Sequence, residues 1–359
     1  ALQAASQLGV SLPQLTSAWA PYIVHASAFL KDGGRLAMVL PAELLHVDYA
    51  HAVREFLLQR FKEVHVVTFE QRVFPGVLEE VLLLLVEGKE GKGDQSMSSS
   101  LLYTVQLRGL EDLRRFEDIF SCCEATPVVK PASKWADHLL STDQARCYNE
   151  LAEREEIMLL GEIAKVDIGV VTGNNDFFLL SRKAIEQWGI EPEFLSKAIR
   201  KAVDISGALF TKADWEELKR RGEKCHLLHV DLPPDVLRAY RLWNYILYGR
   251  EKGVDAGFKC RTRTPWYAVP YIRIPNIFLT YMANRIPRLV LNEAGAVSTN
   301  TIHGVYRLSP DRVNERAFVA SFYNSLTLLS AELVGRSYGG GVLKLETQEA
   351  EKIKLVIPK

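Results

Sequence analysis

The sequence predicts an α/β fold, the closing half of a doubly wound sheet, followed by an α+β domain. Helical and strand patterns alternate over residues 14–87, which is typical of a sheet layered with helices. The strand patterns are continuous apolar runs, as in strands that are covered on both faces. From about residue 126 the signals become short and irregular. We therefore predict two domains, residues 1–125 and residues 126–359.

The first domain begins with a helix and then alternates. Apolar residues at helical spacing predict a helix over residues 14–30. The run Leu36–Leu40 predicts a buried strand, and an amphipathic pattern predicts a helix over residues 42–60. Two more apolar runs, residues 64–69 and 80–87, predict strands near enough in the chain to pair antiparallel. No strand leads into a glycine-rich turn of the kind that holds a nucleotide-like cofactor, so we expect the closing half alone.

The elements beyond residue 88 are less regular. Residues 89–100 predict a glycine- and serine-rich surface loop, and residues 101–125 add a strand and a short helix. Within residues 168–180 we expect strands on both sides of a Gly173–Asn175 turn. The other expected elements are helices at 142–157 and 315–333 and strands at 289–291, 305–307 and 355–357.

The composition is that of an ordinary globular protein. The chain has 359 residues, 48% of them hydrophobic, and a formal net charge of +0. Its longest apolar run, Val81–Val86, is far shorter than the roughly 20 residues of a membrane span. The first residues do not resemble a signal peptide, so we expect a cytoplasmic protein with no membrane partner. The cysteines are Cys122, Cys123, Cys147, Cys225 and Cys260. Because none of them forms a Cys-x-x-Cys pair, we expect free, reduced thiols.

Charge is unevenly divided along the chain. Residues 1–125 carry 11 Lys and Arg against 16 Asp and Glu, and the remainder carries 33 against 28. The basic excess of the second part suits a polyanionic partner, but an ordinary solvated surface often has such a composition. Motifs must therefore decide between the two.

Motifs exclude several enzyme classes. No nucleophile elbow, His-Glu-x-x-His motif or phosphate-binding loop is present, so hydrolase and nucleoside-triphosphatase functions have no support. Cys225, His226 and His229 are residue types that bind zinc, but their spacing is poor and a fourth ligand is not evident. We expect these three residues to be structural and predict no metal site.

A family resemblance covers the first part of the chain. The similar segments are Ser17–Tyr22, Gly33–Glu43, Val53–Leu57, Val73–Pro75 and Val81–Leu83. In this order and spacing, residues 12–88 resemble the post-catalytic part of gamma-class N6-adenine DNA methyltransferases of type II and type IIG restriction–modification systems. The resemblance implies the C-terminal half of a Rossmann-like methyltransferase sheet.

A looser similarity extends over residues 159–359. Val171–Asn175, Ser298–His303 and Tyr338–Leu345 resemble segments of the same family's target recognition domain, which implies double-stranded DNA as the partner. Side chains that reach base edges would set the specificity, with Arg favouring guanine and Asn favouring adenine. The candidate DNA-binding residues are Asn174, Asn175, Arg261, Arg263, Arg285, Asn300, His303 and Lys344.

The resemblance also implies a reaction. The family transfers the methyl group of S-adenosylmethionine to N6 of adenine, and the base must leave the duplex to be reached. By resemblance, Phe74 stacks on the flipped adenine, and we assign it as the catalytic-site residue of this chain. The chain would thus supply a wall of the base-flipping pocket and the recognition of the DNA sequence.

The chain departs from the family in its cofactor and catalytic motifs. Neither the glycine-rich cofactor motif nor the Asn/Asp-Pro-Pro-Tyr/Phe motif is present, and Leu232–Asp235 lacks the required flanks. We therefore expect this chain alone to bind no cofactor and to be inactive, and we expect a missing N-terminal methyltransferase half as partner, in the same or a separate polypeptide. Two rival functions remain. One is a non-catalytic DNA-specificity module that needs a partner methyltransferase half, and the other is an α/β enzyme acting on a small molecule.

Overall fold

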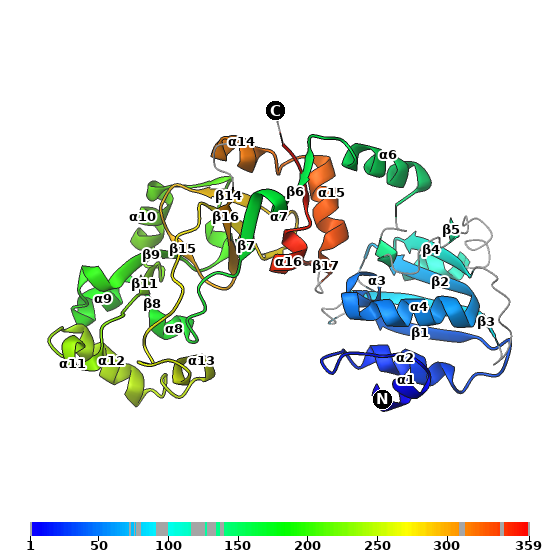
Figure 1. The fold of residues 1–359 in the computed structure, drawn as a ribbon, viewed down its shortest axis with the longest axis horizontal. Coiled ribbons are helices and arrows are strands. Elements are labelled where there is room, and N and C mark those ends of the chain that lie inside the picture. Colours follow the sequence, from blue (N-terminus) through cyan, green and yellow to red (C-terminus); the bar gives the residue numbers. More distant parts are fainter. Residues whose placement is uncertain are drawn as a thin grey trace. The chain divides into compact units, whose positions relative to one another are not determined.

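A computed structural model describes residues 2–71, 73–74, 76, 80–90, 100–115, 126–127, 134–136, 140–308, 313–337 and 341–357. The chain divides into two compact units (Figure 1). Unit 1 comprises Ala1–Leu151 with Gly335–Leu343, and unit 2 comprises Ala152–Val334 with Lys344–Lys359. This division follows compactness, and the predicted functional boundary between residues 125 and 126 stays a prediction.

Unit 1 is a mixed sheet with helices packed on it. Up to residue 152 the elements are α1 (Leu2–Gln7), α2 (Trp19–Ser27), β1 (Leu36–Pro41), α3 (Glu43–His46), η1 (Asp48–Ala50), α4 (His51–Arg60), β2 (Phe61–Phe69), β3 (Val81–Lys89), β4 (Leu101–Leu107), η2 (Leu110–Arg115), β5 (Thr126–Pro127) and α6 (Thr142–Ala152). The strand order is β1-β3-β2-β4-β5. Strand β3 is antiparallel to both β1 and β2, and β2 is parallel to β4.

The apolar runs of the first domain form strands β1, β2 and β3 as predicted, and the predicted antiparallel pairing of β2 with β3 is confirmed. The helix predicted over residues 42–60 is interrupted. Val47 is extended, with φ −74 and ψ 143, so the segment divides into α3, η1 and α4. Helix α2 is also shorter than the predicted 14–30.

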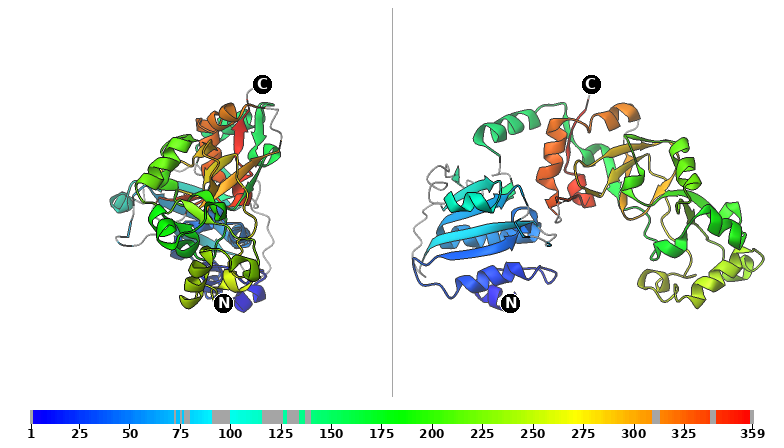
Figure 2. Two further views of the ribbon diagram at one scale, coloured as in Figure 1. Left: turned by 90° about the vertical axis from the view of Figure 1, so that its left-hand side faces the viewer. Right: turned by 180° about the vertical axis from the view of Figure 1, so that it is seen from behind.

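One face of this sheet is covered and the other is open in the described part of the chain. Leu82 and Leu84 of β3 are fully buried in a core shared with α2 and α4. Val39, on the other face of β1, is 51% exposed. Helix α4 lies in front of the strands in Figure 1, and seen from behind the strands face the viewer (Figure 2, right). The expectation of strands covered on both faces is therefore wrong here, because both helices pack on the same face.

Unit 2 is an α+β body of short elements. Beyond residue 156 the strands are β6 (Ile157–Leu159), β7 (Ala164–Asp167), β8 (Leu179–Leu180), β9 (Leu195–Ile199), β10 (Leu209–Phe210), β11 (His226–Leu228), β12 (Ile277–Thr280), β13 (Met282–Ala283), β14 (Leu289–Asn292), β15 (Val297–Ser298), β16 (Ile302–Arg307), β17 (Arg336–Ser337), β18 (Leu343–Lys344) and β19 (Lys354–Val356). Of these, β17 belongs to unit 1. The helices are α7 (Leu160–Ile163), α8 (Asn175–Phe178), α9 (Arg182–Trp188), η4 (Pro192–Phe194), η5 (Ala202–Asp204), α10 (Lys212–Arg220), α11 (Pro234–Leu237), α12 (Leu242–Glu251), α13 (Phe258–Arg261), α14 (Glu315–Ala320), α15 (Ser325–Val334) and α16 (Thr347–Ala350).

The larger sheets of unit 2 have the strand orders β10-β14-β12-β16-β7 and β15-β9-β11-β8. The predicted strands at 289–291 and 305–307 are confirmed by β14 and β16. Of the strands predicted on both sides of the Gly173–Asn175 turn, the second is confirmed by β8, whereas the turn itself leads into helix α8 and the residues before it form an isolated bridge at Val170. The helix predicted over 315–333 is two helices, α14 and α15.

The described residues also bear on the predictions about membrane spans and cysteines. Among these residues, no helix is both long and apolar enough to cross a membrane. Cys147, Cys225 and Cys260 are free thiols, whereas Cys122 and Cys123 lie outside the described residues.

Candidate nucleic-acid interface

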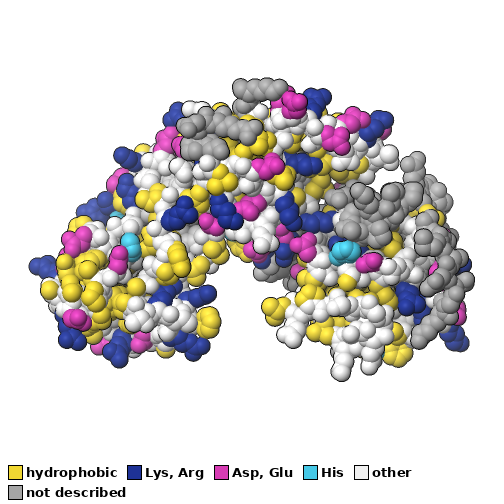
Figure 3. All heavy atoms as spheres, in the orientation of Figure 1, with side chains coloured by type: hydrophobic (Ala, Val, Ile, Leu, Met, Phe, Trp, Pro, Cys, Tyr) yellow, Lys and Arg dark blue, Asp and Glu magenta, His cyan; other side chains and the backbone are white. Residues whose placement is uncertain are grey.

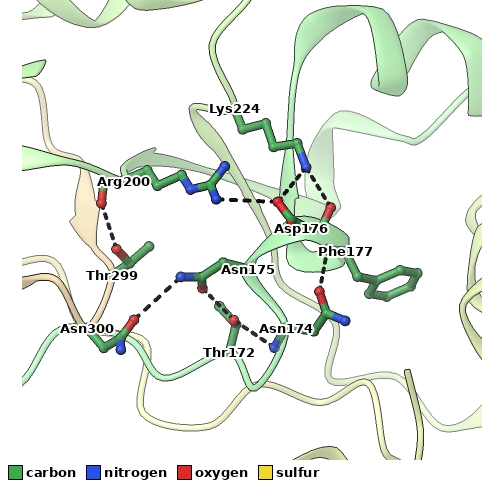
Figure 4. Close-up of polar contacts among 9 residues, drawn as sticks. All are labelled: Thr172, Asn174, Asn175, Asp176, Phe177, Arg200, Lys224, Thr299 and Asn300. Atoms are coloured by element: carbon green, nitrogen blue, oxygen red, sulfur yellow. Dashed lines mark hydrogen bonds and ion pairs between the residues drawn. The ribbon is translucent and has the colours of Figure 1, made fainter. Parts of the chain in front are cut away.

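One end of the sheet β15-β9-β11-β8 gathers segments that are far apart in the sequence. Strands β9 and β15 are parallel, and β11 is antiparallel to β9. Their geometry brings Arg200, Thr299–Thr301 and Lys224 to the same sheet end, because parallel strands end at one edge. The loop after β7 joins them through a bridge between Val170 and Thr299. Figure 4 shows the resulting cluster.

Arg263 fixes the loop of residues 171–175. Its guanidinium donates to the carbonyl oxygens of Val171 at 2.7 Å and Thr172 at 2.8 Å. These charge-assisted bonds offset the burial that lowers the pKa of Arg263. In this structure two donors of Arg263 hold the loop, and its expected contact with DNA stays a prediction.

Two glycines let this loop approach its neighbours. Gly173 has φ +87, and a Cβ there would lie 2.9 Å from Cβ of Lys259 on α13. A Cβ on Gly169 would lie 2.1 Å from the carbonyl oxygen of Thr299. Both positions therefore need glycine, the first for its left-handed backbone as well as for space.

Asn174 caps helix α8. Its side-chain oxygen accepts from the backbone N–H of Phe177 at 3.0 Å, which satisfies one of the helix's free donors. The cap occupies only the side-chain oxygen, and the expected DNA contact from Asn174 stays a prediction. Phe177 itself is buried and stacks on Tyr245 with ring centroids 4.5 Å apart, which anchors the helix in the core.

Asn175 and Asn300 meet at the centre of the cluster. The Nδ2 of Asn175 donates to Oδ1 of Asn300 at 3.5 Å, and Oδ1 of Asn175 accepts from the Thr172 hydroxyl at 2.6 Å. The side chain of Asn300 is exposed. Thr299 and Thr301 both donate to the carbonyl oxygen of Arg200, so the loop that carries Asn300 is fixed. An exposed carboxamide on a fixed loop can present a donor and an acceptor to a base edge.

Helix α13 extends this face with an aromatic side chain that the sequence motifs did not single out. Phe258 is 65% exposed, with Lys259 Nζ 5.7 Å and the Arg261 guanidinium carbon 5.3 Å from its ring centroid. Arg261 is exposed, and its role in DNA binding stays a prediction. The sequence pattern that could have indicated Phe258 is the run Phe258–Arg263, in which an aromatic residue is followed by basic residues at alternate positions.

The remaining candidates lie on other elements of unit 2. His303 is 1% exposed in β16 and its Nε2 lies 2.8 Å from the carbonyl oxygen of Leu345; burial lowers its pKa. A buried ring cannot reach DNA, so His303 is corrected to a core residue. Lys344 is half-buried and pairs with Glu346 at 2.9 Å. Arg285 is exposed between β13 and β14, and its role stays a prediction.

Phe74 belongs to unit 1. It lies in the segment between β2 and β3 and is 41% exposed, so its ring is accessible to a partner. The neighbouring Pro75 of the predicted motif lies outside the described residues, as do residues 338–340 of the last resemblance segment. The role of Phe74 in stacking stays a prediction.

The predicted zinc-like trio has structural partners. Burial raises the pKa of Cys225 to about 11, which makes it a poor thiolate ligand. His226 packs edge-on against Trp215, and His229 lies 3.4 Å from Asp231. These contacts fit the expected structural role of the three residues, and the absence of a metal there stays a prediction.

A second group of potential ligands lies on the open face of the unit 1 sheet. Ligand atoms of Glu63, His65 and Glu87 all lie within 4.8 Å of one another. Arg35 pairs with Glu87 at 2.9 Å, and His65 lies 3.2 Å from Glu63. Each carboxylate thus has a partner within the chain, and the absence of a metal site stays a prediction.

Charge alone does not mark the interface. Figure 3 shows basic and acidic side chains interspersed over the visible face of unit 2. The fixed polar side chains at the sheet end, and not an excess of basic groups, distinguish this face.

Two curated relatives of this chain are type II methyltransferases. The type II methyltransferase M.AccI of Acinetobacter calcoaceticus is 23% identical over 361 residues, which cover 97% of this chain and 63% of that protein. The type II methyltransferase M.XamI of Xanthomonas campestris pv. amaranthicola is 24% identical over 356 residues, covering 97% of this chain and 61% of its own length. The chain therefore aligns with part of each of these two type II methyltransferases, and it spans less than two thirds of their length.

Residues 132–359 identify the family of the chain. They match the family described as type II methyltransferase M.Eco57I, C-terminal domain, and the chain belongs to that family. This confirms the resemblance inferred from the sequence motifs.

A solved structure supports the fold. The type IIL restriction–modification enzyme MmeI in complex with DNA matches 99% of this chain and 43% of its own, with a TM-score of 0.54 and 11% sequence identity. At that identity the match shows a shared fold.

Proposed function

We propose that this chain is the DNA-reading part of a site-specific adenine N6-methyltransferase that uses S-adenosylmethionine in a restriction–modification system. The observation that carries the proposal is the Asn175–Asn300 pair, which lies on two fixed loops within the region that matches a methyltransferase family. Double-stranded DNA is the proposed partner.

The geometry suits recognition of an adenine edge. A carboxamide can accept from the adenine N6 amino group and donate to N7 in the major groove. Asn300 is exposed, and threonine hydroxyls hold its loop to Arg200. Because the loop is already ordered, binding loses less conformational entropy than it would with a mobile loop.

Phe74 is the proposed stacking surface for the flipped adenine. Its exposed ring is free to pack against a base, and such stacking contributes roughly 1–3 kcal/mol per base. In this proposal Phe74 forms one wall of the pocket, and the opposite wall belongs to a segment outside this chain.

S-adenosylmethionine supplies the methyl group, and the chain lacks the motifs that hold it in this family. We propose that a further methyltransferase segment binds the cofactor. The open face of the unit 1 sheet, with Val39 half-exposed, supports such a partner, as does the greater length of the relatives. A non-catalytic specificity module is the second candidate, favoured by the same missing motifs.

A reconstitution experiment separates these functions. The chain is assayed alone and together with the region of M.AccI outside the match, using radiolabelled S-adenosylmethionine and a mixed-sequence duplex pool, and the digested product is analysed by mass spectrometry. N6-methyladenine that requires this chain supports the proposal. Sequence-specific binding without methylation in any combination supports the specificity module, and methylation at cytosine contradicts the adenine assignment.

A further inference from the structure

The same sheet end carries two basic side chains beside the Asn175–Asn300 pair. Arg200 follows β9, and Lys224 comes shortly before β11. Both surround Asp176, the residue next to Asn175 (Figure 4). The Lys224 Nζ donates to the backbone oxygen of Asp176 at 3.0 Å and to its carboxylate at 3.1 Å. An Arg200 terminal nitrogen lies 3.4 Å from the same carboxylate.

Each cation is tied to one member of the asparagine pair. The carbonyl oxygen of Arg200 accepts from Thr299 and Thr301, which flank Asn300. Lys224 is bound to Asp176, which follows Asn175 in the chain. The positions of the basic groups are therefore fixed relative to the base-reading carboxamides.

The charges leave a positive excess. Two cations share one carboxylate, and the exposed fractions of the Arg200, Lys224 and Asp176 side chains are 32%, 36% and 76%. Both cations are thus partly accessible to a ligand. The long contact of Arg200 to Asp176 is the weaker of the two attachments, so its guanidinium can turn to a second anion while Lys224 stays in place.

We propose that Arg200 and Lys224, held by Asp176, bind DNA backbone phosphates that flank the base read by Asn175 and Asn300. In protein–DNA complexes, phosphate contacts set the register and base contacts set the specificity. The cluster places both kinds of group on one rigid sheet end. This inference rests on the proposed function.

Salt titration of duplex DNA binding tests the assignment. Arg200→Ala and Lys224→Ala are compared with the unmodified chain, since each lost phosphate contact lowers the slope of log K against log salt by about 0.9. We expect a slope reduced by about 1 for each variant, with equal weakening on all sequences. Arg200→Lys, which keeps the charge, should retain the slope.

Arg316→Ala is the matched control. Arg316 is also exposed and carboxylate-paired, 2.7 Å from Glu293, but it lies on α14, and its replacement should leave the slope unchanged. Unchanged slopes for both Arg200→Ala and Lys224→Ala, in variants with wild-type melting temperature, overturn the phosphate assignment. If either variant changes the sequence preference while its salt slope stays the same, the phosphate assignment is also overturned, and the residue contacts bases instead. If the unmodified chain binds no DNA even at low salt, the proposed function itself fails.

Discussion

The side-chain nitrogen Nδ2 of Asn175 lies 3.5 Å from the side-chain oxygen Oδ1 of Asn300, a residue 125 positions further along the chain. Two loops that share no local sequence signal are thus joined through their side chains. The pair is supported from both sides, by Arg263 at the first loop and by the carbonyl oxygen of Arg200 at the second.

Replacing Asn300 should change what the protein reads. Asn300→Ala is expected to relax preference at one base position by about 1–3 kcal/mol while leaving the salt slope unchanged. Asn300→Asp loses the donor and keeps the acceptor, so preference at that position should move towards cytosine. Sequencing of duplexes selected by each variant measures this. An unchanged selected motif for both variants would falsify the base-reading role.

Arg263→Lys should destabilise unit 2. Lysine cannot reproduce the forked donation to the carbonyl oxygens of Val171 and Thr172. We expect a loss of about 1–3 kcal/mol in the free energy of unfolding, because buried carbonyl groups lose their partners. Urea unfolding gives the value. Arg261→Lys, two positions earlier in the chain, is the control, and it should change stability by less than about 0.5 kcal/mol; equal effects would contradict the proposed role of Arg263.

Gly173→Ala tests the packing of the first loop. The φ of +87 and the 2.9 Å approach to Lys259 both oppose a side chain. Gly222 has φ +76, and a Cβ added there would meet nothing within 4 Å, so Gly222→Ala reports the backbone effect alone, about 1 kcal/mol. Thermal melts should show a larger loss for Gly173→Ala, together with weaker DNA binding. Matching losses would mean that the contact with α13 is unimportant.

Phe74→Ala should impair methylation without affecting the fold. Its ring is 41% exposed, so little core is lost, whereas a lost stacking contact of about 1–3 kcal/mol slows the reaction roughly 5- to 160-fold. The rate is measured in the reconstituted enzyme, and Phe74→Trp should largely restore it. Phe29→Ala, at another exposed phenylalanine of unit 1, should have no effect. A normal rate for Phe74→Ala would remove it from the pocket.

Acid should destabilise unit 1 through His46. Burial, with the nearby charges of Lys134 and Arg54, lowers the pKa of His46 to about 4. An unfolded histidine is protonated below about pH 6.5, so between these values the unfolded state binds the extra proton. The stability from the neutral ring is therefore complete above about pH 6.5 and is lost as the pH falls towards 4, up to about 3 kcal/mol. Urea unfolding at pH 7 and pH 5 should show this loss, and His46→Gln should reduce it whereas His51→Gln should not.

The sequence by itself determined the strands of unit 1 and the family. Strands β1, β2 and β3 are apolar runs whose burial is a local property of the side chains. Motifs along the chain indicated the methyltransferase family that residues 132–359 match. Phe258 could also have been identified from the sequence, because it is an aromatic residue followed by alternating basic residues.

Only the tertiary structure decided which polar residues can face a ligand. His303 and Asn300 stand three positions apart in one polar segment, yet the first is buried against Leu345 and the second is exposed. Strand β16, which begins at Ile302, is buried at each of its first four residues, His303 included, and its register is set by pairing with β12 and β7. Such pairing depends on residues far away in the chain, so a local pattern names the residue types of a site but leaves their exposure and their partners to the fold.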